Sequence, residues 1–194
     1  MDIQHVAKRV DYDTLLRIGR ELLVAIGEDP EREGLQDTPR RWADWWCEYI
    51  NYEPGKTETC FSSSTEGQLV CVSNIRAWTM CEHHLLPFWC DVSIGYIPHH
   101  KVLGLSKFAR ITQQFAHQLQ IQEHMGQQIA DEVCRIAGTK DVIVFLRGEH
   151  LCTMMRGIRT PCMMTTTIAR GNFENIPEMR QEFSRCVAMN NRGL

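Results

Sequence analysis

The sequence has no long hydrophobic run, little net charge and no apolar segment at its start. No stretch reaches the roughly 18 consecutive apolar residues that a membrane-spanning helix needs, so we expect no membrane partner. Residues 1–10 carry charges throughout, unlike the apolar core of a secretory signal, and we expect a cytoplasmic protein. The formal net charge of -3 provides no basic surface for duplex DNA or RNA, so no nucleic acid partner is expected.

Internal repeats and low-complexity tracts are also absent, and the cysteines do not suggest a disulfide framework. Nine cysteines are spread over 194 residues, an odd number in a chain longer than most disulfide-rich secreted domains. In a reducing compartment we expect them to be metal ligands or small buried hydrophobic side chains. The second role is expected for most of Cys47, Cys60, Cys71, Cys90, Cys134, Cys162 and Cys186.

The first third of the chain has helical periodicity. Residues 11–27 form one predicted helix, capped by Asp11 or Asp13, and a second begins at Thr38 with Pro39 in its first turn. Four aromatic residues recur on one face of the second helix and most simply form a docking face: Trp42, Trp45, Trp46 and Tyr49. We assign residues 1–66 to a helical extension with a polar linker, and residues 67–194 to the main domain.

The main domain alternates strand and helix patterns. Strands are expected at residues 68–78, 88–97, 102–105, 141–146, 149–156 and 165–169. Helices are expected at residues 106–120 with Ser106 as N-cap, at 123–137 ending at Gly138, and at 173–189. This order predicts an α+β domain in which antiparallel strands carry helices on one face.

Two short clusters contain metal-binding residue types. Cys81 and His84 lie three apart before a proline, a spacing that is a weak signal by itself. On a strand over residues 149–156, Cys152 would share a face with His150 and Arg156 and could complete the set. Two thiolates and one imidazole leave a fourth position for water, which is typical of catalytic zinc.

Other polar residues suit an anionic, nucleotide-like substrate. His150 would lie close enough to the metal to act as general acid or base, and Arg156 about 13 Å further along the strand could bind an anion. Ser106, Lys107 and Arg110 lie at a helix start, where backbone N–H groups bind phosphate. Taken alone, Lys107 and Arg110 are more often solvated charges. Glu123 could bind guanine, but by itself it is more simply a first-turn acid.

Several motifs together resemble the GTP cyclohydrolase I family, in one collinear order over about nine-tenths of the chain. They are 81–88 (CEHHLLPF), 102–107 (VLGLSK), 120–123 (QIQE), 149–152 (EHLC) and 156–159 (RGIR). Flanking matches are 27–35 (GEDPEREGL), 37–41 (DTPRR) and 180–183 (RQEF). The resemblance implies a tunnelling fold, in which sheets of several subunits close a barrel, and a homodecamer with active sites between subunits.

The resemblance also implies a reaction and a set of roles. The reaction is hydrolysis of GTP at C8 with loss of formate, followed by rearrangement to 7,8-dihydroneopterin triphosphate. The implied zinc ligands are Cys81, His84 and Cys152, and the implied acid/base residues are His83 and His150. The implied substrate contacts are Gln122 and Glu123 for guanine, and Ser106, Lys107, Arg110, Arg156 and a neighbouring subunit's equivalent of Arg41 for ribose and triphosphate.

The chain departs from the family pattern at Gln118 and His124, where arginine is usual, and over residues 160–164. These departures leave room for an alternative, a non-catalytic relative that binds zinc and a purine or pterin. A third interpretation is another tunnelling-fold enzyme, such as a nitrile reductase of deazaguanine synthesis. The complete Cys/His/Cys set argues against it, because that chemistry needs a thiol nucleophile without zinc.

Overall fold

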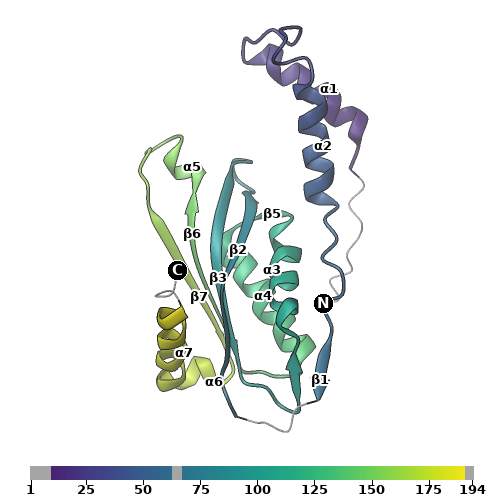
Figure 1. The fold of residues 1–194 in the computed structure, drawn as a ribbon. Helices are drawn as coiled ribbons and strands as arrows, with labels where there is room; N and C mark the ends of the chain where they lie inside the picture. Colours follow the sequence, from purple (N-terminus) through teal and green to yellow (C-terminus); the bar gives the residue numbers. More distant parts are fainter. Residues whose placement is uncertain (1–9, 63–66, 191–194) are drawn as a thin grey trace. The chain divides into compact units, whose positions relative to one another are not determined.

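The computed structural model describes residues 10–62 and 67–190 (Figure 1). The chain divides into two compact units, one ending at Glu53 and the other beginning at Pro54. Within the described residues, no helix combines the length and the apolar character needed to cross a bilayer.

The first unit is a pair of helices, α1 (Tyr12–Ala25) and α2 (Thr38–Ile50), as the periodicity predicts. Asp11 caps α1, since its carboxylate accepts hydrogen bonds from the backbone N–H and the hydroxyl of Thr14, at 3.0 and 2.8 Å. The helices approach closely at Gly19, where a Cβ would lie 3.1 Å from the Cα of Pro39. A side chain at this position would require the two helices to shift apart by a few tenths of an ångström.

The second unit is built on a five-stranded sheet with strand order β5-β2-β3-β6-β7. Its strands are β2 (Val70–Cys81), β3 (Pro87–Tyr96), β5 (Leu119–Gln120), β6 (Val142–His150) and β7 (Met163–Arg170). β2, β3, β6 and β7 pair antiparallel, whereas β5 runs parallel to the end of β2. A separate antiparallel pair joins β1 (Cys60–Ser62) to β4 (Lys101–Leu103).

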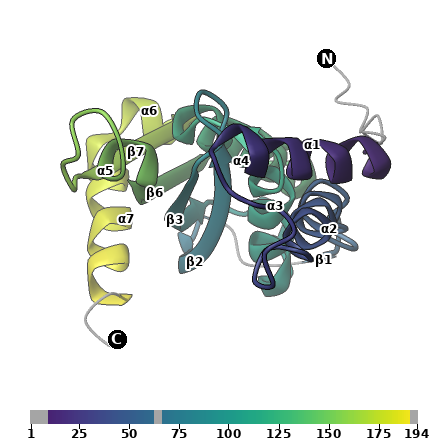
Figure 2. The same cartoon turned by 90° about the horizontal axis from the view of Figure 1, so that it is seen from above.

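Two helices, α3 (Leu105–Ala116) and α4 (Gln122–Ala137), cover one face of the sheet and form the main core. The C-terminal helices α6 (Asn172–Asn175) and α7 (Pro177–Asn190) pack on the other face (Figure 2). Along β6, Val144 belongs to the first core and Ile143 to the second. The α+β class is confirmed, but the expectation that the helices share one face is wrong, because β6 is apolar on both sides.

Four of the predicted elements need correction. Strands expected at 141–146 and 149–156 are one strand, β6, which continues through Gly148 and ends at His150. The chain then turns into a short helix, α5 (Leu151–Met154), instead of continuing as a strand. The N-cap of α3 is Gly104, not Ser106, which lies inside the first turn. The single C-terminal helix is interrupted at Ile176, which is extended because Pro177 follows it.

Candidate metal centre and active site

The turn between β2 and β3 folds His84 back beside Cys81. The carbonyl of Cys81 accepts hydrogen bonds from the backbone N–H groups of His84 and Leu85, at 3.3 and 2.9 Å. Leu85 has a φ of 51°, a left-handed conformation that closes this tight turn. The end of β6 reaches the same place, because His150 is paired with Phe88 at the start of β3. Helix α5 therefore starts next to the turn.

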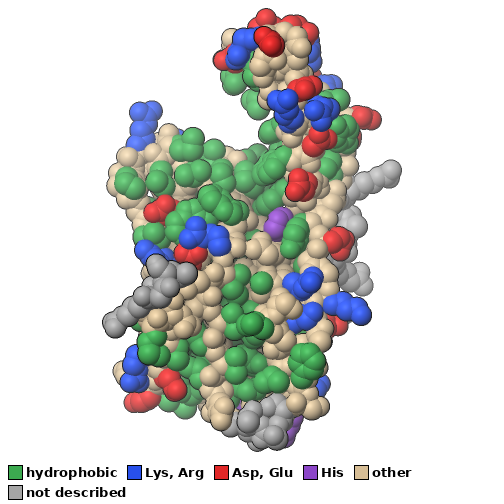
Figure 3. All heavy atoms as spheres, in the orientation of Figure 1, with side chains coloured by type: hydrophobic (Ala, Val, Ile, Leu, Met, Phe, Trp, Pro, Cys, Tyr) green, Lys and Arg blue, Asp and Glu red, His purple; other side chains and the backbone are tan. Residues whose placement is uncertain are grey.

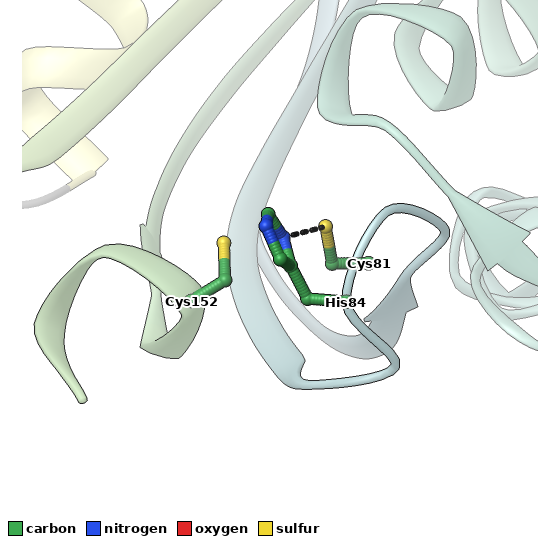
Figure 4. A group of neighbouring side chains, drawn as sticks. All are labelled: Cys81, His84 and Cys152. Atoms are coloured by element: carbon green, nitrogen blue, oxygen red, sulfur yellow. Dashed lines mark hydrogen bonds between the residues drawn. The ribbon is translucent and has the colours of Figure 1, made fainter. Parts of the chain in front are cut away.

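Three side chains converge at this point (Figure 4). The ligand atoms of Cys81, His84 and Cys152 all lie within 4.8 Å of one another, and the Cys81 Sγ is 3.6 Å from His84 Nδ1. Cys81 and Cys152 are buried, whereas His84 is exposed. Tetrahedral zinc with bonds of about 2.0–2.3 Å holds its ligand atoms roughly 3.4–3.8 Å apart, so small side-chain movements would bring all three onto one ion.

The electrostatics of the two thiols also fit a cation. Burial raises the pKa of the Cys152 thiol, and the neighbouring Cys81 raises it further, while Arg156 opposes the shift. Two adjacent thiolates are unfavourable in a buried site because their charges repel. A divalent cation between them would remove this repulsion and deprotonate both. Two sulfurs and one imidazole nitrogen are a donor set that suits zinc.

His150 lies beside this cluster in a fixed orientation. Its ring stacks on Phe88, with centroids 4.2 Å apart and an interplanar angle of 11°. Its Nε2 lies 3.0 Å from the Oε1 of Gln122. Burial lowers the pKa of His150, and the charge of Glu123 opposes that shift. A half-buried imidazole held on two sides suits proton transfer.

Gln122 and Glu123 begin α4 but face different surroundings. The Gln122 side chain is 0% exposed and its amide lies behind His150. Glu123 is exposed, and a carboxylate in this position can accept hydrogen bonds from a ligand. Sequence reasoning treated the two as a pair that contacts guanine. The structure separates them into one enclosed side chain and one open side chain.

Arg156 lies much closer to the metal ligands than strand spacing predicts. Its Nη1 is 2.5 Å from His84 Nε2, so the expected separation of about 13 Å from Cys152 along a strand is wrong. The chain coils after β6, and Thr160 N–H bonds the carbonyl of Thr153. His83 is exposed, and its Nδ1 is 4.0 Å from the Cys81 Sγ. Both residues therefore lie at the cluster.

The other predicted anion contacts lie elsewhere. Helix α3 leads to β5, which pairs with the end of β2 beside Cys81. The first turn of α3 therefore lies at the opposite end of the sheet from Cys81 (Figure 1). From Ser106 to the last turn the helix rises roughly 15 Å. The Lys107 Nζ donates to the carbonyl of Lys56 at 2.7 Å, and Arg110 donates to that of Pro54. Arg41 belongs to the first unit, where it pairs with Asp37 at 3.2 Å.

Sequence reasoning missed two residues beside His150. Phe88 was noted only within a motif, and its stacking on His150 follows from the strand register. Cys90 was expected to be an inert buried thiol, yet its Sγ lies 3.3 Å from the Gln122 Oε1. The alternation of Phe88 and Cys90 along β3 places both on the face that carries Gln122, but only pairing with β6 reveals the contact.

These features define an α+β protein with a Cys/His/Cys cluster that could hold a metal ion beside a histidine. The family described as GTP cyclohydrolase I matches residues 17–188. The chain is 43% identical over 179 residues to "GTP cyclohydrolase 1" of Hyperthermus butylicus, covering 92% of each chain. It is 44% identical over 181 residues to that of Deinococcus radiodurans, covering 90% of this chain and 83% of the relative. For that of Corynebacterium glutamicum the identity is 43% over 188 residues, covering 94% and 96%. The chain therefore belongs to the GTP cyclohydrolase I family and is an enzyme.

Proposed function

We propose that the protein is a zinc-dependent enzyme that hydrolyses GTP at C8, releases formate and forms 7,8-dihydroneopterin triphosphate. This is the first step toward pterins, folate or deazaguanines. The observation that carries the proposal is the convergence of Cys81, His84 and Cys152 within 4.8 Å, next to a histidine that is held in place. Such a set leaves one coordination position for water, as catalytic zinc sites do.

Each side chain around the metal would have a separate task. Zinc, when bound, would supply an activated water at near-neutral pH. His150 and His83 would exchange protons with the imidazole ring of guanine as it opens. Arg156 would bind the phosphates, which requires its guanidinium to move from His84 toward the ligand. The buried thiols would keep the metal in one position throughout.

Glu123 would select guanine over adenine. A carboxylate accepts two hydrogen bonds, one from N1–H and one from the exocyclic amine of guanine, and adenine does not present that pair of donors. Glu123 is exposed at the first turn of α4, directly after the residue that holds His150. The base would thereby be anchored close to the proton-transferring histidine.

Ser106, Lys107 and Arg110 would act on a substrate bound to another copy of the chain. They lie at the start of α3, at the far end of the sheet from Cys81. Exposed apolar side chains also gather on the face drawn in Figure 3, and this unit exposes Trp78, Leu105, Met155 and Ile158. Exposed apolar surface is typical of an interface. We therefore infer a homo-oligomer, a decamer with the tunnelling-fold barrel, in which Arg41 comes from a further subunit.

The test is formate release from GTP together with pterin fluorescence and bound zinc. Cys152→Ala should lose zinc and activity together, whereas Cys186→Ala, a matched change in α7, should keep both. Arg156→Ala should chiefly raise KM. Wild-type protein that binds zinc and GTP but releases no formate would refute the reaction.

A second experiment tests whether each active site is built from residues of two chains. Cys152→Ala and Lys107→Ala should each be inactive, but subunits of the two variants assembled together should recover activity. In a mixed oligomer, some interfaces combine the intact metal ligands of the Lys107→Ala chain with the intact anion-binding residues of the Cys152→Ala chain. Mixed oligomers that stay inactive would contradict a site built by two chains.

A further inference from the structure

The amide of Gln122 is enclosed by groups that allow it one orientation. On one side its Nε2 faces the carbonyl oxygens of Leu146 and Met164, at 3.5 and 3.3 Å, and the hydroxyl of Thr166, at 3.1 Å. Backbone carbonyls only accept hydrogen bonds, so the NH₂ group must point toward them. Turning the amide over would place its oxygen against two other oxygens in a site without exposure to water.

The amide oxygen therefore faces His150 and Cys90. The Oε1 is 3.0 Å from the His150 Nε2 and 3.3 Å from the Cys90 Sγ. Cys90 is buried and its pKa is raised to about 12 by burial, so it remains a thiol that donates to this oxygen. A carbonyl oxygen cannot donate, and the contact with His150 is a hydrogen bond only when Nε2 carries the proton.

We propose that Gln122 is a positioning residue that fixes the orientation and tautomer of His150, so that Nε2 donates its proton to the Gln122 amide oxygen and Nδ1 is the unprotonated nitrogen of the neutral ring. The inference rests on the proposed function and assigns the side chain of Gln122 to His150 instead of to the substrate. Turning the ring over by 180° would keep the stack on Phe88 but place a carbon, Cε1, where Nε2 meets the Gln122 oxygen, so the hydrogen bond is made only in the observed orientation.

Substitutions at two positions separate positioning from packing. Gln122→Met has similar length and no acceptor, and it should lower kcat about 100-fold while the KM for GTP and the zinc content stay unchanged. Thr166→Val removes a contact on the NH₂ side only and should leave kcat close to wild type. Gln122→Glu keeps an oxygen toward His150, with its second oxygen protonated against Met164, and should recover much of the rate lost in Gln122→Met.

A structural readout tests the tautomer without reference to turnover. Neutron diffraction from the zinc-loaded wild-type protein, with crystals at about pH 8 where a histidine ring is ordinarily neutral, should show deuterium on His150 Nε2 and none on Nδ1. Deuterium on Nδ1 alone would overturn the proposal, as would Gln122→Met with unchanged kcat. If Gln122→Met does not fold, the wild-type neutron map still decides.

Failure of the proposed function gives a different result. Wild-type protein that releases no formate would refute the reaction, while the neutron map would still test the assignment of the proton. A correct tautomer together with a fully active Gln122→Met variant would show that Gln122 orients the ring without any effect on catalysis, which contradicts the proposed role.

Discussion

Replacing Gly148 by alanine should damage the sheet and the support of His150 together. Gly148 is paired with Cys90 across β3 and β6. An added Cβ would lie 2.3 Å from the carbonyl oxygen of Trp89, 2.7 Å from the Cys90 Sγ and 3.0 Å from the Gln122 Oε1. The closest of these atoms is backbone of a paired strand, so it can move away only if the ladder itself is distorted.

The size of the effect follows from that contact. Overpacking in a core costs typically about 1–3 kcal/mol, with flexible neighbours at the low end. Here the strand pair must separate, so we expect a loss near or above about 3 kcal/mol in the free energy of unfolding, a large part of the roughly 5–15 kcal/mol typical of folded domains. Displacing the Gln122 oxygen should also lower kcat.

Urea unfolding at a fixed protomer concentration measures the loss, because oligomer stability depends on concentration. Gly34→Ala is the control, since its Cβ would have only an ordinary contact, 3.5 Å from Arg32 Nη1. It should change stability by no more than about 1 kcal/mol. If Gly148→Ala also loses less than about 1 kcal/mol, the packing argument is refuted.

Three further predictions concern other parts of the chain. Burial raises the pKa of the Cys90 thiol from 9.0 to about 12, so the contribution of the neutral thiol to stability is complete below about pH 9 and is lost as pH rises toward 12. The free energy of unfolding should therefore fall by up to about 1.4 kcal/mol per pH unit in this range, and it should fall less steeply in Cys90→Ala. Asp11→Ala should destabilise the α1–α2 unit by about 1 kcal/mol in thermal or urea unfolding, and an unchanged stability would show that this cap is unimportant. All nine cysteines are described and only Cys162 is exposed, so iodoacetamide should label it first; a fast phase that persists in Cys162→Ser would contradict this.

The sequence was sufficient to predict that Cys81, His84 and Cys152 come together, but the geometric reason given for one of them was wrong. Cys81 and His84 are local partners, and their turn could be anticipated from Pro87. Cys152 was placed by strand alternation, yet it lies on α5. A four-residue helix has no propensity signal strong enough to predict, since helix nucleation is costly, and it exists here through tertiary contacts.

The environment of His150 could not be predicted from the sequence. The carbonyl groups that orient Gln122 lie on strands far along the chain, at Leu146 and Met164. Gly148 falls between the strands expected at 141–146 and 149–156, whereas in the structure it lies within β6, where β3 and Gln122 approach the backbone too closely for any side chain. Both facts depend on strand register, which the sequence pattern alone does not determine.

The most direct test of the central claim is X-ray absorption at the zinc edge on the purified, zinc-loaded protein. The account predicts a first shell of two sulfurs at about 2.3 Å, one imidazole nitrogen at about 2.0–2.1 Å and one oxygen from water. In Cys152→Ala the shell should lose a sulfur or the protein should lose zinc. A wild-type shell closed by a fourth protein ligand, or zinc bound equally well without Cys152, would contradict it.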